Sequence, residues 1–408
     1  MCIPENNKDL LNKRFIDFIS NTTDLKPDTK IRIKDIFNSA WDDFLIYAKK
    51  EKYDIREVIF EEVDRIMKCG SLSEGYYTYV CKDCDTVHYC PFHCHSRFCP
   101  SCGVNAILKK TDDILQKMVN VPHRHLVFTI PEELRKTFQR KRKVCINILF
   151  ESINDTIKYI IRQGTTKKEA NEDYVPGFIS TLHTFGRDLK WNPHIHVIIA
   201  ECLSGNNNVY KKLFIPYALI RKSFQNVLLK KLEKHFGIVK FRALKNKIYS
   251  KTENGFYVYA KENSCKNVKD TIKYNIRYHG RPAIAESRLI YFDGTIVKFW
   301  YDRHEDGKRV IETLHVFEFI KRLIVHIQEK YTNTIRYYGF YNRTLRQSSK
   351  LRKLVNETYF KARECINSWR NKLRFYFNTD PLICKFCGKI MELSSITIKN
   401  KTYSYDSC

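Results

Sequence analysis

The cysteines of this chain gather in one short stretch, and this clustering is the feature that most restricts its fold. Seven of the 15 cysteines lie between Cys69 and Cys102. A disulfide framework would spread its cysteines along the chain and would need an oxidising compartment. The stretch instead contains two Cys-x-x-Cys pairs with 14 residues between them, a spacing typical of structural zinc sites. The sequence therefore predicts a zinc-binding module.

Four of these cysteines are the strongest candidates for zinc ligands: Cys81, Cys84, Cys99 and Cys102. Each pair offers two thiolates to one tetrahedral ion, and the loop between the pairs is long enough to bring them together, so we expect one zinc site. The candidates for a second ion are Cys69 and Cys94 together with one of His88, Cys90, His93 or His95. These residues either hold a second zinc or are small buried residues beside the first, and the sequence favours neither interpretation.

A third pair, Cys384 and Cys387, lies near the C-terminal end of the chain. It needs two further ligands, which either Cys408 or the remaining N-terminal residues would supply. The pair is therefore a candidate second knuckle whose partners the sequence leaves open.

Another informative stretch is residues 191–200, in which His194 and His196 lead into Val-Ile-Ile. Side chains two apart in a β-strand lie on the same face, so both imidazoles share one face while Ile195 points into a core. Two imidazoles on one face can hold a divalent ion, although an edge strand with two solvated histidines would show the same pattern. His183 lies close by in the sequence and is a candidate third ligand or DNA contact.

Residues 271–278, further along the chain, predict a helix that ends at Gly280. Tyr274 and Tyr278 are four residues apart and therefore share a face of this helix. A metal-binding histidine pair together with a tyrosine pair is the equipment of an enzyme that cuts single-stranded DNA through a phosphotyrosine. The alternative is that both tyrosines pack against a sheet. The tyrosines of residues 335–341 are rival nucleophiles by number, but their neighbours predict a structural role.

The charge of the chain favours a polyanionic partner. Its 72 basic and 45 acidic residues give a formal net charge of +27, for which nucleic acid is the first expectation. A hydrophobic content of 43% argues against disorder. No apolar run approaches the length of a membrane span, and residues 1–20 lack a signal-peptide core. We therefore expect a cytoplasmic protein with no membrane partner.

Residue periodicity predicts a mixed chain of helices and strands. The predicted helices span residues 28–49, 53–68, 105–118, 132–162, 216–236 and most of 310–378. The predicted strands span 125–130, 177–184, 194–200 and 255–260, followed by a hairpin over 288–303. Basic residues alternate with aromatic ones in 240–247, a mixture that suits single-stranded DNA, although a solvated helix face explains it equally well.

Taken together, these motifs resemble the bacterial rolling-circle insertion-sequence transposases of the HUH (His-hydrophobic-His) class that carry an N-terminal zinc-binding region. The matching stretches are 94–102, 125–135, 183–189, 193–196, 274–284, 319–322 with His326, and 336–339. Their order and spacing are specific, whereas no single stretch is. The family pattern often has a histidine before the proline of the HUH strand. Asn192 takes that place here, which leaves the two central histidines untouched.

The resemblance implies an α+β fold with a ferredoxin-like catalytic domain, in which the HUH strand is central to an antiparallel sheet and the tyrosine helix packs beside it. It also implies the use of Mg²⁺ or Mn²⁺ and transposition through a single-stranded intermediate. We expect four regions: an N-terminal helical region (1–68), a zinc-binding module (69–106), an HUH catalytic domain (107–303) and a helical C-terminal region (304–408).

On this basis we predict that His194 and His196 bind the catalytic ion and that Tyr274 or Tyr278 attacks DNA, leaving a 5′-phosphotyrosine. The partners would be single-stranded DNA and transposon ends; the oligomeric state is left open. One alternative is a non-catalytic zinc-dependent DNA-binding protein. Another is a plasmid rolling-circle replication initiator of the same chemistry. A metalloprotease is disfavoured because the His-Glu-x-x-His helix is missing.

Overall fold

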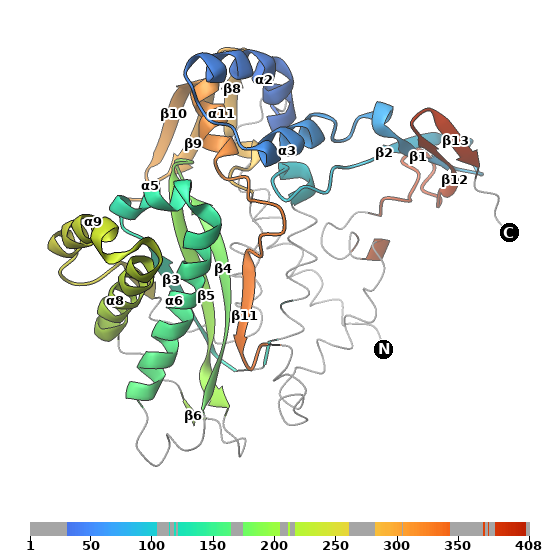
Figure 1. Cartoon of the computed structure of the whole chain (residues 1–408). Coiled ribbons are helices and arrows are strands. Elements are labelled where there is room, and N and C mark those ends of the chain that lie inside the picture. Colours follow the sequence, from blue (N-terminus) through green and yellow to red (C-terminus); the bar gives the residue numbers. More distant parts are fainter. Residues whose placement is uncertain are drawn as a thin grey trace. The chain divides into compact units, whose positions relative to one another are not determined.

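The computed structural model separates the chain into two compact units, each described here by itself (Figure 1). The first consists of Met1–Ala106, Ile284–Lys321 and Glu357–Cys408, and the second of Ile107–Ala283 and Arg322–Asn356. The structure describes residues 31–103, 114, 118–119, 121–164, 174–204, 211–212, 217–260, 282–303, 305–342, 370–371, 374 and 380–404. The division into four regions stays a prediction.

The second unit is built on an antiparallel sheet in which the strand that carries both histidines is central. The strand order is β11-β4-β5-β3-β7, with β6 paired to β5 outside this path. The strands are β3 (His123–Thr129), β4 (Val175–Phe185), β5 (Trp191–Ser204), β6 (Lys211–Lys212), β7 (Val258–Ala260) and β11 (Ile335–Gly339). The sheet confirms the predicted α+β class and the central place of the HUH strand.

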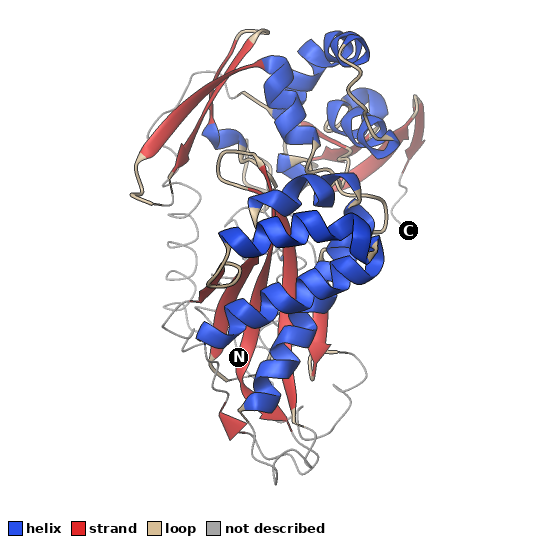
Figure 2. Cartoon of the chain, turned by 60° about the vertical axis from the view of Figure 1, so that its left-hand side comes forward, coloured by secondary structure: helices blue, strands red, loops and turns tan. Residues whose placement is uncertain are grey.

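Helices cover one face of this sheet (Figure 2). They are α5 (Glu132–Arg140), α6 (Arg142–Gln163), α8 (Tyr217–Phe236) and α9 (Ile238–Lys251). The core between the layers receives Ile195, Val197 and Ile199 from β5, because alternate side chains of a strand point to the same side. His194 and His196 therefore point to the opposite face.

Two predicted features of these helices can be compared with the structure. The single helix expected over 132–162 is instead two helices, because the backbone leaves the helical region at Lys141 (φ −118°, ψ 50°). Gly237 ends α8 as expected, and its φ of 88° is readily adopted only by glycine. The helices predicted over 105–118 and 271–278 fall outside the described residues, apart from residues 114 and 118.

In its described residues, the first unit combines helices with two small sheets. Two of these helices, α2 (Ile33–Lys50) and α3 (Glu57–Met67), lie close to the predicted positions. One sheet has the order β10-β9-β8, from β8 (Leu289–Phe292), β9 (Ile296–Asp302) and β10 (Arg309–His315). The predicted hairpin is confirmed: Asp293 Oδ1 accepts hydrogen bonds from the backbone N–H of Thr295 (2.8 Å) and Ile296 (2.7 Å), which fixes the turn.

The other sheet joins segments from the two ends of the chain. Its order is β13-β12-β1-β2, from β1 (Tyr76–Val80), β2 (Val87–Pro91), β12 (Glu392–Ile398) and β13 (Lys401–Ser404). Antiparallel pairing of β1 with β12 places Val80 opposite Glu392. The C-terminal segment is therefore part of the same folded body as the zinc-binding stretch.

In the described part of the C-terminal region, α11 (Val316–Ile324) is followed by the strands β11, β12 and β13, and residues 370–371 and 374 are helical. β11 carries Ile, Tyr and Tyr, which favour strands, and it pairs with β4 so that Gly339 faces Gly177. Residues 343–369 of the predicted helical region lie outside the described residues. Among the helices described, none is long and apolar enough to cross a membrane.

Candidate active site and metal centres

Three histidines meet on the face of the central sheet that is turned away from the helices. The register of β4 and β5 places His183 directly opposite His194, and His196 follows two residues later on the same face. Their candidate ligand nitrogens all lie within 4.8 Å of one another. We call these three residues the histidine cluster. The structure thus brings the predicted pair together with His183, which the sequence offered only as a candidate.

One ring nitrogen of His194, Nδ1, is hydrogen-bonded to the backbone. Its Nδ1–H donates to the carbonyl oxygen of Asn192 at 2.7 Å, so Nε2 carries the lone pair that a metal ion needs. Burial lowers the pKa of His194, which keeps the imidazole neutral. Because the main chain of Asn192 makes this contact, the contact itself does not depend on the side chain at position 192.

His196 has a side-chain partner instead. Its Nδ1 lies 3.0 Å from Nε2 of His125 on β3, with the two rings 5° from parallel. One of these nitrogens must donate the proton. If His196 offers Nε2 to a cation, its Nδ1–H donates to His125, which then orients the ligand. In the sequence, His123 and His125 form a second alternate pair, which could help the metal site but is more typical of ordinary hydrogen-bonding residues at a strand entrance.

A buried network fixes the turn between β4 and β5. His326 Nε2–H donates to the carbonyl oxygen of Leu189 at 2.9 Å, and the Thr184 hydroxyl lies 3.2 Å from His326 Nδ1. Trp191 stacks on the His326 ring at 6.1 Å between centroids. Burial lowers the pKa of His326 to about 4, so the ring is neutral. This network holds the register that sets His183 against His194.

Four cysteine sulfurs converge in the first unit to form the first thiol cluster. Its members are Cys69, Cys94, Cys99 and Cys102. Cys102 Sγ lies 3.5 Å from Cys69 Sγ and 3.6 Å from Cys94 Sγ, and Cys99 Sγ lies 3.8 Å from Cys69 Sγ. Four sulfurs around a tetrahedral zinc at about 2.3 Å lie roughly 3.8 Å from one another. The cluster therefore has the dimensions of a structural zinc site.

A second thiol cluster lies where an N-terminal segment of the chain meets a C-terminal one, beside the paired strands β1 and β12. Its members are Cys81, Cys84, Cys384 and Cys387. Cys81 Sγ lies 3.4 Å from Cys387 Sγ, and Cys84 Sγ lies 3.7 Å from Cys384 Sγ. These separations also suit a tetrahedral zinc. The pairing of β1 with β12 provides this geometry, because each strand adjoins one of the two knuckles.

The expected grouping of Cys81 and Cys84 with Cys99 and Cys102 in one site needs correction. The structure places the two pairs in different clusters. Proximity along the chain suggested the first grouping, whereas a strand pairing between distant segments decides the second. Cys408, an earlier candidate for the C-terminal knuckle, lies outside the described residues. His93 stays beside the first thiol cluster, with Nδ1 3.7 Å from Cys69 Sγ.

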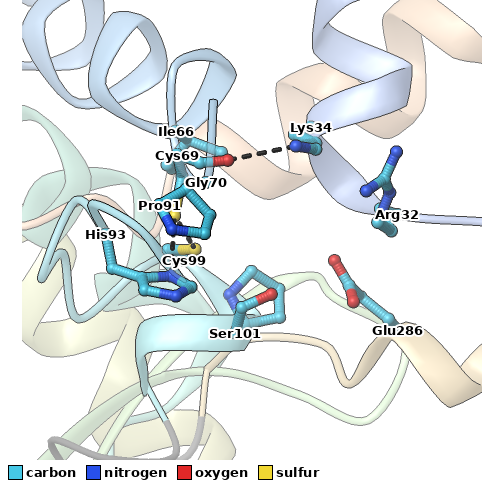
Figure 3. Close-up of a pocket in the computed structure, with 11 residues that line it drawn as sticks. Arg32, Lys34, Ile66, Cys69, Gly70, Pro91, His93, Cys99, Ser101 and Glu286 are labelled. Carbon is cyan, nitrogen blue, oxygen red and sulfur yellow. Dashed lines mark hydrogen bonds between the residues drawn. The ribbon is translucent and has the colours of Figure 1, made fainter. Parts of the chain in front are cut away.

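A pocket adjoins the first thiol cluster (Figure 3). Lys34 reaches across it and donates from Nζ to the carbonyl oxygen of Cys69 at 3.1 Å. Arg32, on its rim, forms an ion pair with Asp35 at 2.9 Å. Its two cations are thus bound within the chain, and we assign the pocket a structural role in joining α2 to the thiol cluster.

The two predicted nucleophiles, Tyr274 and Tyr278, lie in residues 261–281, outside the described residues. The rival tyrosines of β11 and the following turn are built into the sheet and core. Tyr338 stacks on Phe178 at 4.6 Å between centroids. Tyr341 is buried, with its hydroxyl 2.6 Å from His123 Nε2.

The basic stretch of α8 and α9 is partly neutralised. Lys231 forms an ion pair with Asp155 at 2.9 Å, and Lys245 forms one with Glu233 at 2.7 Å. These contacts lie within the second unit and stabilise the helices there. Of the basic residues in 240–247, only Lys245 is engaged by these two pairs, so both interpretations of that stretch stay open.

Comparison with known proteins matches both parts of the chain. Residues 177–349, which include the histidine cluster, match a family model described as a putative transposase. Residues 36–130 match the model of a transposase zinc-binding domain. Together the two matches cover more than half of the chain. Cys384 and Cys387 lie outside both.

Two curated relatives are similar over much of their length. The transposase for insertion sequence element IS801 of Pseudomonas savastanoi pv. phaseolicola is 26% identical, over 90% of this chain and 91% of the relative. The putative transposase y4qJ of Sinorhizobium fredii (strain NBRC 101917 / NGR234) is 26% identical, over 68% of this chain and 73% of the relative. No solved structure matches the chain significantly.

Proposed function

The chain belongs to the transposase family with an IS91-type zinc-binding domain, and from this premise we propose that it nicks and rejoins single-stranded DNA at insertion-sequence ends through a 5′-phosphotyrosine. The observation that carries the proposal is the convergence of His183, His194 and His196 on one sheet face. Such a protein would work in the bacterial cytoplasm, associated with the nucleoid when it acts.

The histidine cluster would hold the catalytic divalent ion. Three imidazole nitrogens leave coordination positions open for a DNA phosphate and water. Because nitrogen donors are softer than the oxygens that Mg²⁺ prefers, this set fits Mn²⁺ better than Mg²⁺. When bound, the ion would draw electron density from the scissile phosphate and stabilise the charge that develops there. His194 contributes Nε2, since its Nδ1–H is engaged with Asn192.

The proposed chemical step is an exchange of one phosphodiester for another. The phenolic oxygen of Tyr274 or Tyr278 bonds to phosphorus while the bond from phosphorus to the 3′ oxygen breaks. The tyrosine loses its proton, and the departing 3′ oxygen gains one to become a hydroxyl. A free tyrosine has a pKa of about 10, so the site must assist deprotonation. The covalent link keeps the bond available for rejoining, and the second tyrosine lets the site take a second DNA end.

Each thiol cluster would hold one structural zinc ion. Cys69, Cys94, Cys99 and Cys102 would form the first site, and Cys81, Cys84, Cys384 and Cys387 the second. Among the described residues, the apolar cluster around Cys81 and Cys384 contains Met391 and Tyr79. With so small a core beside the second cluster, a bound ion would contribute directly to folding.

The test is a cleavage assay on single-stranded oligonucleotides that span the element's ends, with Mn²⁺ or Mg²⁺, followed by a denaturing protein gel. We expect a DNA–protein adduct that disappears in Tyr274→Phe with Tyr278→Phe and persists in Tyr337→Phe. Tight binding with no adduct, on ends known to support transposition, would replace the proposal with a non-catalytic DNA-binding protein. Cleavage at a plasmid origin but not at element ends would instead indicate a replication initiator.

A further inference from the structure

The two knuckles of the second thiol cluster share one backbone conformation. In the first, the N–H of Cys81 donates to the carbonyl oxygen of Thr86 at 3.0 Å. In the second, the N–H of Cys384 donates to the carbonyl oxygen of Lys389, again five residues on, at 2.8 Å. The residue after the second cysteine has a positive φ in both, 53° in the first and 72° in the second. The two loops can therefore be compared position by position.

The loops differ at the tip. The first presents Lys82 and Asp83 between its cysteines, and the second presents Lys385 and Phe386. The Phe386 side chain is 88% exposed. Because an aspartate occupies the equivalent position of the first loop, the knuckle conformation does not require an aromatic ring there. The ring buries almost no surface within the described part of the chain. Its presence therefore suggests that a ligand binds to this exposed ring.

The charges of the two loops also favour a ligand at the second loop rather than the first. The second loop carries exposed Lys385 and Lys389 and no acidic residue, whereas the first carries Asp83 and Asp85 beside a single lysine. An exposed ring between two cations is the combination that binds single-stranded nucleic acid, in which bases stack on rings and cations contact phosphates. An apolar partner protein would not need the two lysines.

We propose that the loop Cys384–Lys389 binds single-stranded DNA, with Phe386 stacked on a base and the two lysines on neighbouring phosphates. The inference rests on the proposed function, since it takes the DNA on which this chain acts as the ligand. Ile383 (42% exposed) and Ile390 (57% exposed) pair beside the tip and extend its apolar surface. The zinc ion of the second thiol cluster would hold the loop rigid, so little entropy is lost on binding.

The experiment measures DNA binding separately from cleavage. Full-length protein is titrated into a fluorescent oligo-deoxythymidine of about 20 nucleotides, longer than the sites of common single-strand-binding folds, and anisotropy is recorded. We expect Phe386→Ala to weaken binding roughly 5- to 150-fold, the effect of losing one base–aromatic stack. Phe386→Trp should bind like the unsubstituted protein. Asp83→Ala, at the equivalent tip position, should not weaken binding. Zinc content is measured for every variant to show that the knuckle is intact.

Two results would overturn the inference. One is unchanged affinity in Phe386→Ala at full zinc content. The other is a change in self-association by sedimentation with no change in DNA affinity, which would make the tip a protein-binding surface. Either result leaves the adduct assay of the proposed function unaffected. Conversely, loss of binding in Phe386→Ala alongside a protein that forms no adduct would support the loop while refuting the nuclease.

Discussion

The imidazole of His125 lies parallel to that of His196, with 3.0 Å between Nε2 of the first and Nδ1 of the second. The contact joins β3 to the histidine cluster on β5. Metal-binding histidines depend on the partner of their second nitrogen, so under the proposed function His125 is a positioning residue for the cluster.

His125→Phe should therefore weaken Mn²⁺ binding. The phenyl ring keeps the stacked shape but accepts no hydrogen bond, so His196 loses the partner that fixes its tautomer. Loss of such a partner typically costs about 10- to 100-fold in metal affinity. Calorimetric titration with Mn²⁺ measures the change, and His125→Gln, whose amide oxygen still accepts a hydrogen bond, is the matched control. Equal affinity in all three proteins would show that His125 only fills space.

Cysteine substitutions should separate the two zinc ions. We expect Cys384→Ser and Cys102→Ser each to release one of two zinc ions, because the substituted residues belong to different thiol clusters. The variant with both substitutions should contain none. Elemental analysis of purified protein gives the stoichiometry. If the Cys384→Ser protein kept its full zinc content, the result would instead support a single zinc site built from the N-terminal cysteines.

Acid should destabilise the chain partly through His123. This buried ring has a pKa lowered to about 4, mainly by desolvation, whereas the unfolded residue titrates near 6.5. As the pH falls from 6.5 to 4, only the unfolded state takes up the proton, so stability falls in that window and no further below it. The loss is on the order of 3 kcal/mol.

His123→Asn should remove this contribution. Urea unfolding at several pH values would show a smaller acid-induced loss of unfolding free energy for the variant. Zinc release at low pH affects both proteins, so the difference between them isolates the histidine. Parallel pH profiles would mean that His123 is protonated in the folded state.

Among the described glycines of the central sheet, Gly339 should tolerate an added side chain least. Its φ is 59°, and an added Cβ would overlap the carbonyl oxygen of Pro176 on the paired strand β4. Gly339→Ala should therefore destabilise the second unit more than Gly237→Ala. The latter has a positive φ with nothing near the added Cβ, and its backbone strain should cost about 1–3 kcal/mol. Urea unfolding measures both, and equal losses would contradict the overlap.

Local patterns predicted most elements correctly, and long-range contacts explain the differences. The shared face of His194 and His196 follows from strand alternation alone, so the sequence was sufficient for it. His183 joins them only through the register of β4 and β5, which the His326 network holds from more than 130 residues away. The sequence predicted both strands but not which of their residues face each other.

The cysteines show even more clearly that local patterns cannot predict long-range contacts. Spacing identified the three Cys-x-x-Cys pairs of the two thiol clusters, since such a pair is a local geometric unit, whereas Cys69 and Cys94 were only candidates for a second ion. Which pairs share an ion depends on β1 meeting β12, a contact between segments about 300 residues apart. No periodicity within either segment encodes that choice.

The second thiol cluster also has a consequence for synthesis. A ribosome that has released Cys81 and Cys84 must add the remainder of the chain before Cys384 and Cys387 can reach them. Chains that stop early would display the first knuckle alone, with two of the four proposed ligands. If the site holds the proposed zinc ion, binding of that ion by all four thiolates would require a chain that extends through Cys387.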